Sequence, residues 1–318
     1  MATAQIMPYA AMTGEESRAE AAGKPARSLA VAIVTYNSGS VLPDLLASLP
    51  AGLAGIEHVQ VFVVDNDSSD GSADIAERHA CRPQVIRTGR NGGYAAGINA
   101  AAGAADANSD LLVLNPDIRL LPGAGGVLLD RLAADASIGV VAPQILGTDG
   151  HIARSLRREP SIATVWAESL LGGRLAARLG MGETIASPDL YAQGGAVEWA
   201  TGAVLMVSAW ARRLVGSWDE SFFLYSEEVD YLRRVREFGL SVEYVPEAKV
   251  VHIGGDYQSS PHLSGLMAAN RIRDYGRRHG RARSQVFRMG IVVGEAMRAG
   301  LGPSHRAALR AALAADRS

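Results

Sequence analysis

The chain has 318 residues, of which 48% are hydrophobic and 20% are charged, and its formal net charge is −2. A chain of this length and composition can bury a substantial core, which excludes a largely disordered protein. Its one cysteine, Cys81, excludes an intramolecular disulfide framework and a zinc site of several cysteines, so we expect a reducing compartment, the cytoplasm.

The first 27 residues mix acidic and basic side chains with alanines and contain no apolar core. This composition predicts a flexible N-terminal tail and is neither that of a secretory signal nor that of a membrane span. No stretch of the sequence approaches the roughly 18 uninterrupted apolar residues that a transmembrane helix requires. We therefore expect a soluble protein or one that contacts a membrane from its surface.

The first part of the chain alternates short apolar runs with segments of helical spacing. The predicted strands cover 28–36, 58–65, 84–87 and 110–115, and the predicted helices cover 41–49, 73–79 and 94–102. This alternation is typical of an α/β fold in which a mostly parallel, Rossmann-like sheet is flanked by helices. In such folds ligands bind at the carboxyl ends of the strands.

The alternation continues less regularly beyond residue 120. Segments 127–134 and 138–143 extend it, whereas 147–195 loses periodicity and is predicted to be a flexible, variable excursion over the site. An apolar run follows at 197–207, then a helix that begins near Ser226, two strands at 241–245 and 249–253, and helices to the end of the chain.

Four polar clusters each follow a predicted strand and should share one rim of the sheet. They are Thr35-Tyr36-Asn37, Asp65-Asn66-Asp67, Asn91-Gly92-Gly93 and Asn115-Pro116-Asp117. Each cluster alone has the composition of an ordinary turn. Together they would place Asp65 and Asp117 at one rim, where an anionic diphosphate binds only if a divalent cation lies between the charges. The sequence therefore predicts a site for Mg²⁺ or Mn²⁺.

Two other nucleotide-binding classes lack their sequence signals. A Rossmann oxidoreductase needs G-x-G-x-x-G directly after the first strand, and the segment from Thr35 to Ser40 offers only Gly39. A nucleotidyltransferase needs a glycine-rich loop with a lysine at the same place, and residues 35–43 contain no lysine.

Five segments, in order, resemble the motif series of the inverting family 2 glycosyltransferases. They are AIVTYNSGSVLPDLLASL, VFVVDNDSSDGSADIA, NGGYAAGINAA, LLVLNPDI and WDESFFLYSEEVDYLRRVREFGLSVEYVPEAKVVHIGG. The resemblance implies a GT-A fold with a catalytic domain over 28–256. Within it, 28–120 would bind the nucleotide sugar and 121–256 would bind the acceptor and hold the catalytic groups. A basic helical region, 257–318, would follow.

The resemblance also implies roles for individual residues at the donor site. Tyr36 would stack on the nucleotide base and Asp65 would hydrogen-bond its edge. Asp117 occupies the place of the last aspartate of the family's DxD motif, which here reads Asn115-Pro116-Asp117, so His252 is expected as the second protein ligand of the metal. The other expected donor-site residues are Thr35, Asn37, Asn91, Gly92, Asn115, Thr201 and Gly202.

The segment Ser226-Glu227-Glu228-Val229-Asp230 resembles the family's E-D-x-D helix start. Glu228 stands where the catalytic base is usually aspartate, so we rank Glu228 first and Glu227 second as base, with Asp230 in the same acidic cluster and Arg234 pairing with it. The alternative is that Ser226 caps the helix and the two glutamates complement its dipole.

The C-terminal end is strongly basic, because residues 271–318 contain eleven arginines and three acidic residues. Val286, Met289, Val293 and Met297 lie on one side of a predicted amphipathic helix. This helix is expected either to rest on an anionic membrane surface, such as the inner face of the plasma membrane, or to pack on the catalytic domain or on a homodimer partner.

Together these features predict an inverting, metal-dependent transferase that moves a hexose from a nucleoside diphosphate to a hydroxyl of a glycan or of a polyprenyl-diphosphate-linked acceptor. Similarity to bacterial rhamnosyltransferases of cell-wall and surface-polysaccharide assembly favours L-rhamnose from dTDP-rhamnose. A UDP-sugar donor (galactose, glucose or galactofuranose) and a non-catalytic scaffold that binds sugar nucleotides remain the alternatives. No nucleic-acid partner is expected.

Overall fold

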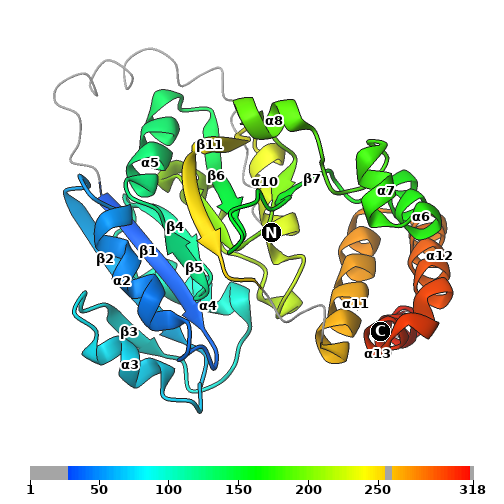
Figure 1. Ribbon diagram of the computed structural model, residues 1–318, viewed down its shortest axis with the longest axis horizontal. Helices are drawn as coiled ribbons and strands as arrows, with labels where there is room; N and C mark the ends of the chain where they lie inside the picture. Colours follow the sequence, from blue (N-terminus) through cyan, green and yellow to red (C-terminus); the bar gives the residue numbers. More distant parts are fainter. Residues whose placement is uncertain (1–27, 255–259, 316–318) are drawn as a thin grey trace, which may run out of the picture.

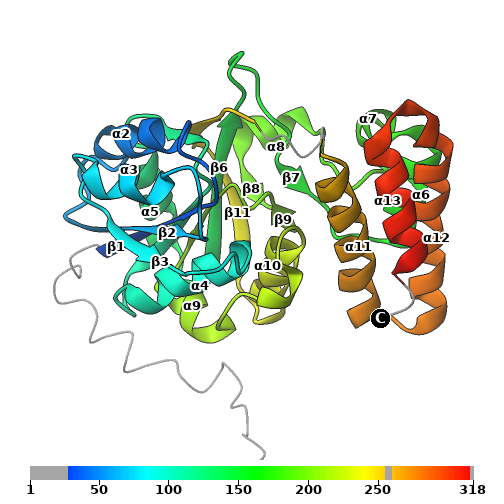
Figure 2. The same ribbon diagram turned by 90° about the horizontal axis from the view of Figure 1, so that it is seen from below.

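A computed structural model describes residues 28–254 and 260–315 (Figure 1). The predicted N-terminal tail, 1–27, lies outside the described residues. The described chain forms a sheet covered by helices and, beside it, a separate bundle of helices (Figures 1 and 2).

The first half of the sheet is parallel, in the order β3-β2-β1-β4. Its strands are β1 (Ser28–Thr35), β2 (His58–Asp65), β3 (Gln84–Arg87) and β4 (Asp110–Leu114), and the returning helices are α2 (Leu42–Gly52), α3 (Ser72–Arg78) and α4 (Tyr94–Ala104). Every residue of β1 after Ser28 is buried, as expected for a central strand with helices on both faces. Thr35 pairs with Asp65, so the ends of β1 and β2 lie side by side.

The second half of the sheet is mixed and continues in the order β10-β6-β11-β5. β10 (Val204–Val207) runs antiparallel to both β4 and β6 (Ile138–Leu146), whereas β6 and β11 (Ser241–His252) are parallel. The remaining elements are β5 (Ile118–Leu120), α5 (Ala124–Ala134), β7 (Leu156–Arg157), β8 (Gly195–Ala196), β9 (Trp199–Ala200), α9 (Ala209–Val215), η2 (Glu220–Phe222) and α10 (Glu227–Glu237). The predicted α/β class with a Rossmann-like sheet and flanking helices is confirmed.

Two predictions about the second half were wrong. The two strands expected at 241–245 and 249–253 are one strand, β11, whose pairing with β6 shifts register between Val245 and Lys249 around Pro246. The excursion 147–195 contains three helices, α6 (Ile162–Leu171), α7 (Gly173–Arg178) and α8 (Pro188–Gln193). Its helical pattern was hidden because α6 is buried by a partner from the far end of the sequence.

That partner belongs to a helical body formed by α6 and α7 with α11 (Pro261–Arg278), α12 (Arg281–Arg298), η4 (Ala299–Leu301) and α13 (Pro303–Ala314). Val165 of α6 packs in one core with Phe287 and Ile291 of α12. A Cβ at Gly290 would lie 2.9 Å from Val165 Cγ1, so this glycine allows the two helices to approach closely. The expected catalytic domain, 28–256, and basic region, 257–318, remain a prediction; α6 and α7 come from within the former but pack with the latter.

None of the helices among the described residues is both long and apolar enough to span a bilayer.

Two glycines of α4 test how tightly this helix packs on the sheet. A Cβ at Gly97 would lie 2.5 Å from Val34 Cγ1, whereas a Cβ at Gly103 would meet nothing within 4 Å. Gly97→Ala should therefore lower the free energy of unfolding by about 1–3 kcal/mol through overpacking. Gly103→Ala, the matched control, should raise it by about 0.5–1 kcal/mol. Urea unfolding measures both, and equal effects of the two substitutions would contradict the close approach of α4 to β1.

Candidate active site

The loops after β1 and β2 are joined by side-chain hydrogen bonds at the rim of the sheet. Asn37 Oδ1 accepts from the Ser69 amide at 2.8 Å, and the Asn37 amide donates to Ser68 Oγ at 2.9 Å. Asp65 is buried and its Oδ2 accepts from the Ser68 amide at 3.1 Å. Beside them Tyr36 is 52% exposed, so its ring is open for stacking. Tyr36 and Asp65, the residues predicted to contact the nucleotide base, thus lie at the same rim of the sheet.

Two buried acceptors at this rim have no partner of their own. Asp65 Oδ1 and Thr35 Oγ1 make no hydrogen bond among the described residues. A buried polar atom without a partner is costly, so such atoms mark places where a ligand or water completes the structure. Asp65 therefore presents a free carboxylate oxygen beside the exposed ring of Tyr36.

The third cluster forms a tight turn that contacts a distant loop. Asn91 Oδ1 accepts from the Gly93 amide, and the Asn66 side chain donates to the Gly93 carbonyl at 2.9 Å. A Cβ on Gly93, which has φ 89°, would lie 2.2 Å from the Phe223 carbonyl oxygen, and the Tyr94 amide donates to that oxygen at 2.8 Å. Asn91 and its neighbour Gly92 shape this turn and do not line the cavity described below.

The loop that this turn contacts is strained. Phe223, Tyr225 and Ser226 have φ values of 59°, 68° and 75°, a region that bulky residues rarely adopt. The strain is held by Asn270 of α11, a buried residue whose amide donates to the carbonyls of Phe222, Leu224 and Tyr225 at 2.7, 2.8 and 3.2 Å. α10, which carries the two candidate glutamates, begins directly after this loop.

Ser226 lies at the N-cap position of α10, but its side chain makes no capping hydrogen bond. Its left-handed backbone directs the chain so that Glu227 and Glu228 begin the helix. The predicted capping of α10 by the Ser226 side chain is therefore not observed. The glutamates do lie at the positive end of the helix dipole, as the same alternative expects.

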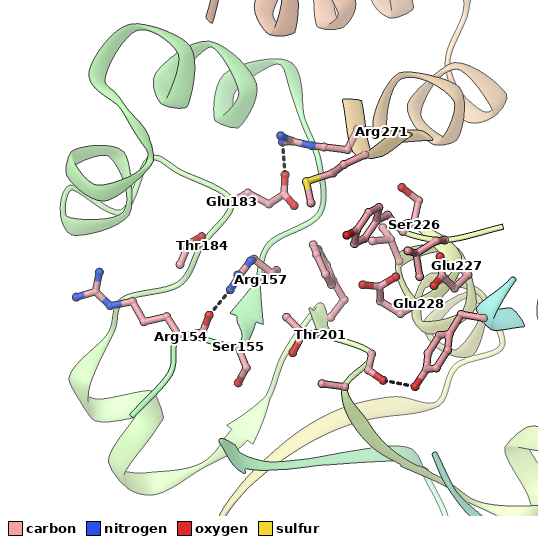
Figure 3. A pocket seen from close by; sticks show the side chains of 18 of the residues that line it. Arg154, Ser155, Arg157, Glu183, Thr184, Thr201, Ser226, Glu227, Glu228 and Arg271 are labelled. Carbon is pink, nitrogen blue, oxygen red and sulfur yellow. Dashed lines mark hydrogen bonds and ion pairs between the residues drawn. The ribbon is translucent and has the colours of Figure 1, made fainter. Parts of the chain in front are cut away.

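The two glutamates line a cavity of about 670 Å³ between the sheet and the helical body (Figure 3). Thr201 and Gly202 form one wall, close to Glu228, and the Tyr94 hydroxyl donates to the Gly202 carbonyl at 3.0 Å. Other lining residues come from the excursion and from α11: Arg154, Ser155, Arg157, Glu183, Met267 and Arg271. Sequence reasoning missed Tyr94, Asn270 and most of this lining, because the contacts that gather them join parts of the chain far apart in sequence.

Burial and mutual repulsion make both glutamates weak acids. Burial, and then the charge of Glu228, raises the pKa of Glu227 to about 8. Burial also raises the pKa of Glu228, against the opposing effect of hydrogen bonding to backbone. Each carboxyl retains one buried oxygen, Oε2, without a hydrogen-bond partner among the described residues. A carboxylate that holds a proton tightly in a cavity is suited to act as a general base.

Asp117 and His252 lie together where β4 turns into β5, with Asp117 Oδ2 3.0 Å from His252 Nε2. Asp117 Oδ1 is buried and has no partner among the described residues. A carboxylate oxygen beside an imidazole nitrogen suits a divalent metal, so the residues fit the predicted ion. Within 28–254 and 260–315 no group of three or more acidic, histidine or cysteine side chains gathers to hold a metal.

The Asp117–His252 pair and the two glutamates lie near one another. Burial and the charges of Glu227, Glu228 and Asp117 together raise the pKa of Tyr94 well above its ordinary value. Asn115 and His252 also line the cavity. The predicted base, Glu228, and the predicted metal ligand Asp117 therefore both lie near the Tyr94 side chain, which lines the same cavity as His252.

Asp230 does not join them, and its place in the catalytic set is corrected. It is buried but absent from the lining of the cavity. One of its oxygens pairs with Arg233, and the other accepts from Arg234 Nε at 2.8 Å, as the spacing predicts. Since both oxygens are held by arginines, Asp230 anchors the helix and is not available to a substrate.

Residues 30–187 match the family model described as Glycosyl transferase family 2. An N-acetylglucosaminyl-diphospho-decaprenol L-rhamnosyltransferase of Mycobacterium tuberculosis is 32% identical over 234 residues, which cover 70% of this chain and 75% of that protein. The chain belongs to glycosyltransferase family 2.

Solved structures show the same fold for this glycosyltransferase. A mannosyltransferase from Pyrobaculum calidifontis in complex with GDP-Man and Mn²⁺ has a TM-score of 0.55 and 13% identity, over 90% of this chain and 80% of that one. GalNAc-T7 with UDP, GalNAc and Mn²⁺ has a TM-score of 0.54 and 13% identity, over 84% of this chain and 55% of that one. These likenesses confirm the GT-A fold.

The support of the strained loop by Asn270 can be tested on the glycosyltransferase directly. Asn270→Ala should lower kcat about tenfold or more, because losing hydrogen bonds to three carbonyls costs at least about 1.4 kcal/mol of positioning, and should change donor KM little. Arg273→Ala is the matched control, since Arg273 also lies on α11 but donates to Ser221, before the strained residues. An unchanged kcat for a folded Asn270→Ala variant would contradict this role.

The raised pKa of Glu227 predicts how stability depends on pH. The folded chain binds the proton of Glu227 more tightly than the unfolded chain, so stability falls as pH rises from 4.5 through about 8. Glu227→Gln should therefore raise Tm by about 4 °C or more near pH 9 and change it little near pH 4.

Glu237→Gln, at the exposed end of the same helix, serves as the control and should give no gain that grows with pH. Thermal melting followed by circular dichroism measures all three chains. Parallel curves of Tm against pH for the native chain and Glu227→Gln would show that Glu227 has an ordinary pKa.

Proposed function

We propose that this family 2 glycosyltransferase transfers L-rhamnose from dTDP-rhamnose, with inversion, to a hydroxyl of a lipid-diphosphate-linked sugar in bacterial cell-wall synthesis. The observation that carries the proposal is the cavity lined by the buried glutamates, Tyr94 and His252, with Asp117 paired to His252. The choice of rhamnose and of a lipid-linked acceptor is supported by the name of the mycobacterial relative. Cytoplasmic localisation stays a prediction from the single cysteine.

In the proposed reaction the donor lies along the rim of the sheet. Tyr36 stacks on the base, and the free oxygen of Asp65 accepts a hydrogen bond from the edge of the base. Asp117 and His252 would hold the divalent ion, which, when bound, neutralises charge on the leaving diphosphate. Thr201 and Gly202 form the wall beside the donor sugar, and the absence of a side chain at Gly202 leaves that sugar room next to Glu228.

The acceptor hydroxyl enters the proposed reaction from the cavity side. Glu228 removes its proton as the oxygen attacks the anomeric carbon from the face opposite the diphosphate. The bond from that carbon to the diphosphate oxygen breaks, and the diphosphate departs with the electron pair. Glu227, whose pKa is raised to about 8, carries a proton near neutral pH, which removes one negative charge from the glutamate pair.

The first test measures nucleotide release from dTDP-, UDP- and GDP-sugars with Mn²⁺, with Mg²⁺ and with EDTA. We expect turnover of dTDP-rhamnose that requires the metal. Glu228→Gln should lower it by at least about 100-fold while retaining donor binding, and Glu228→Asp should restore part of it. Asp117→Ala should abolish this metal-dependent turnover together with tight donor binding.

Glu237→Gln on the same helix is the matched control and should retain activity, since Glu237 is exposed and paired with Arg233. Proton NMR of the product gives the anomeric configuration. If only a UDP-sugar is turned over, dTDP-rhamnose is not the donor. Retention of configuration would overturn the inverting mechanism. Donor binding without turnover in the presence of a lipid-diphosphate acceptor would favour a non-catalytic scaffold.

A further inference from the structure

One side of α12 exposes apolar side chains to solvent. Val286, Met289 and Met297 are 44%, 46% and 62% exposed. The opposite side of the helix, with Phe287 and Ile291, is buried in the helical body. The helix therefore uses one apolar side for the core of the helical body and leaves these three side chains on the other side partly open to solvent.

Exposed apolar side chains also lie on the elements that pack next to α12. α6 lies beside α12, since Trp166 Nε1 donates to the Val286 carbonyl at 3.1 Å and Arg298 donates to the Glu168 and Ser169 carbonyls at 3.0 Å each. The next residues of α6 are exposed leucines, and more follow on α7 and after α12. We call the following set the outer apolar surface: Leu170, Leu171, Leu175, Leu179, Val286, Met289, Met297 and Leu301.

The exposed charge around this surface is basic. The acidic residues of the described helical body are all paired, Glu168 with Arg271, Asp274 with Arg278, and Glu295 with His305. By contrast, no ion pair within 28–254 and 260–315 involves the exposed arginines of α7 and of the start of α12, which are Arg174, Arg178, Arg281 and Arg283.

We propose that the outer apolar surface and its four flanking arginines dock this protein on an anionic phospholipid bilayer. Exposed leucine and methionine side chains enter the boundary between headgroups and acyl chains, and arginines bind lipid phosphates beside them. A second copy of the chain would oppose like charges across the interface, because both faces carry the unpaired arginines. Charge complementarity therefore favours the lipid surface over a homodimer.

The docking surface belongs to the same body that closes the active-site cavity. α11 supplies Met267 and Arg271 to the cavity lining and packs against α12 and α13. Docking through α6, α7 and α12 would therefore place the bilayer against the helical body that also lines the cavity. The inference deepens the proposed function and rests on it only for the lipid-linked nature of the acceptor.

The test is sedimentation of the full chain with vesicles that contain no acceptor. Vesicles of phosphatidylcholine mixed with phosphatidylglycerol should bind it about tenfold more tightly than vesicles of phosphatidylcholine alone, and high salt should weaken this binding. Met289→Glu/Met297→Glu should weaken it by about tenfold or more, and Arg174→Glu/Arg178→Glu should do the same. Trp210→Glu/Phe238→Glu, a matched exposed pair on the catalytic side, should bind as the native chain does.

Equal binding to both vesicle types, or native binding by the methionine variant, would overturn the proposal. So would a concentration-dependent dimer in analytical ultracentrifugation that Met289→Glu/Met297→Glu abolishes, which would assign the face to a second copy. Transfer to a soluble acceptor is measured in parallel on each variant. A variant that loses vesicle binding but still transfers sugar to the soluble acceptor supports the docking surface. If the native chain does not bind vesicles but does transfer sugar, the docking proposal fails while the proposed function stands.

Discussion

The arrangement of the active site depends on one strained loop, Phe223 to Ser226. Three of its residues have left-handed backbone, and that conformation persists only because neighbouring groups hold it. On one side Gly93 packs closely against the Phe223 carbonyl and the Tyr94 amide donates to it. On the other side the Asn270 amide donates to three carbonyls of the loop. The loop thus sets where α10 begins, and with it the position of both glutamates. Both supports come from outside the loop, one from the first half of the sheet domain and one from the helical body.

The same loop explains how opposite electrostatic demands meet in a small volume. A donor diphosphate needs positive charge near Asp117, and an acceptor hydroxyl needs a carboxylate that accepts its proton. Glu227 and Glu228 lie together out of water, so each disfavours ionisation of the other, and the pair holds a proton at a pH where a free glutamate would not. Tyr94, which hydrogen-bonds to Gly202, is close enough to these carboxyl groups and to Asp117 for the charges of all three to raise its pKa.

Local pattern was sufficient to predict the first four strands, because β1, β2 and β4 each contain an apolar run that ends in a polar turn. It was also sufficient to predict that Asp230 pairs with Arg234, since both lie on one helix. Local pattern failed where burial depends on distant partners. Apolar residues of α6 are buried against α12, which lies far along the chain. Asn270 has no sequence signal, because its three acceptors lie about 45 to 48 residues earlier in the chain. Local pattern also placed Asp230 in the catalytic set from motif position alone, which does not show where a side chain points.

The packing of α6 on α12 has a consequence for the order in which the molecule is made. A ribosome completes α6 about 110 residues before it begins α12, and β5 likewise waits for β11. During that interval Val165 and its neighbours have no permanent cover, and such exposed apolar segments are the usual starting point of aggregation. Recombinant yield of this chain should therefore be limited by how quickly its last quarter emerges and folds, rather than by the stability of the finished sheet.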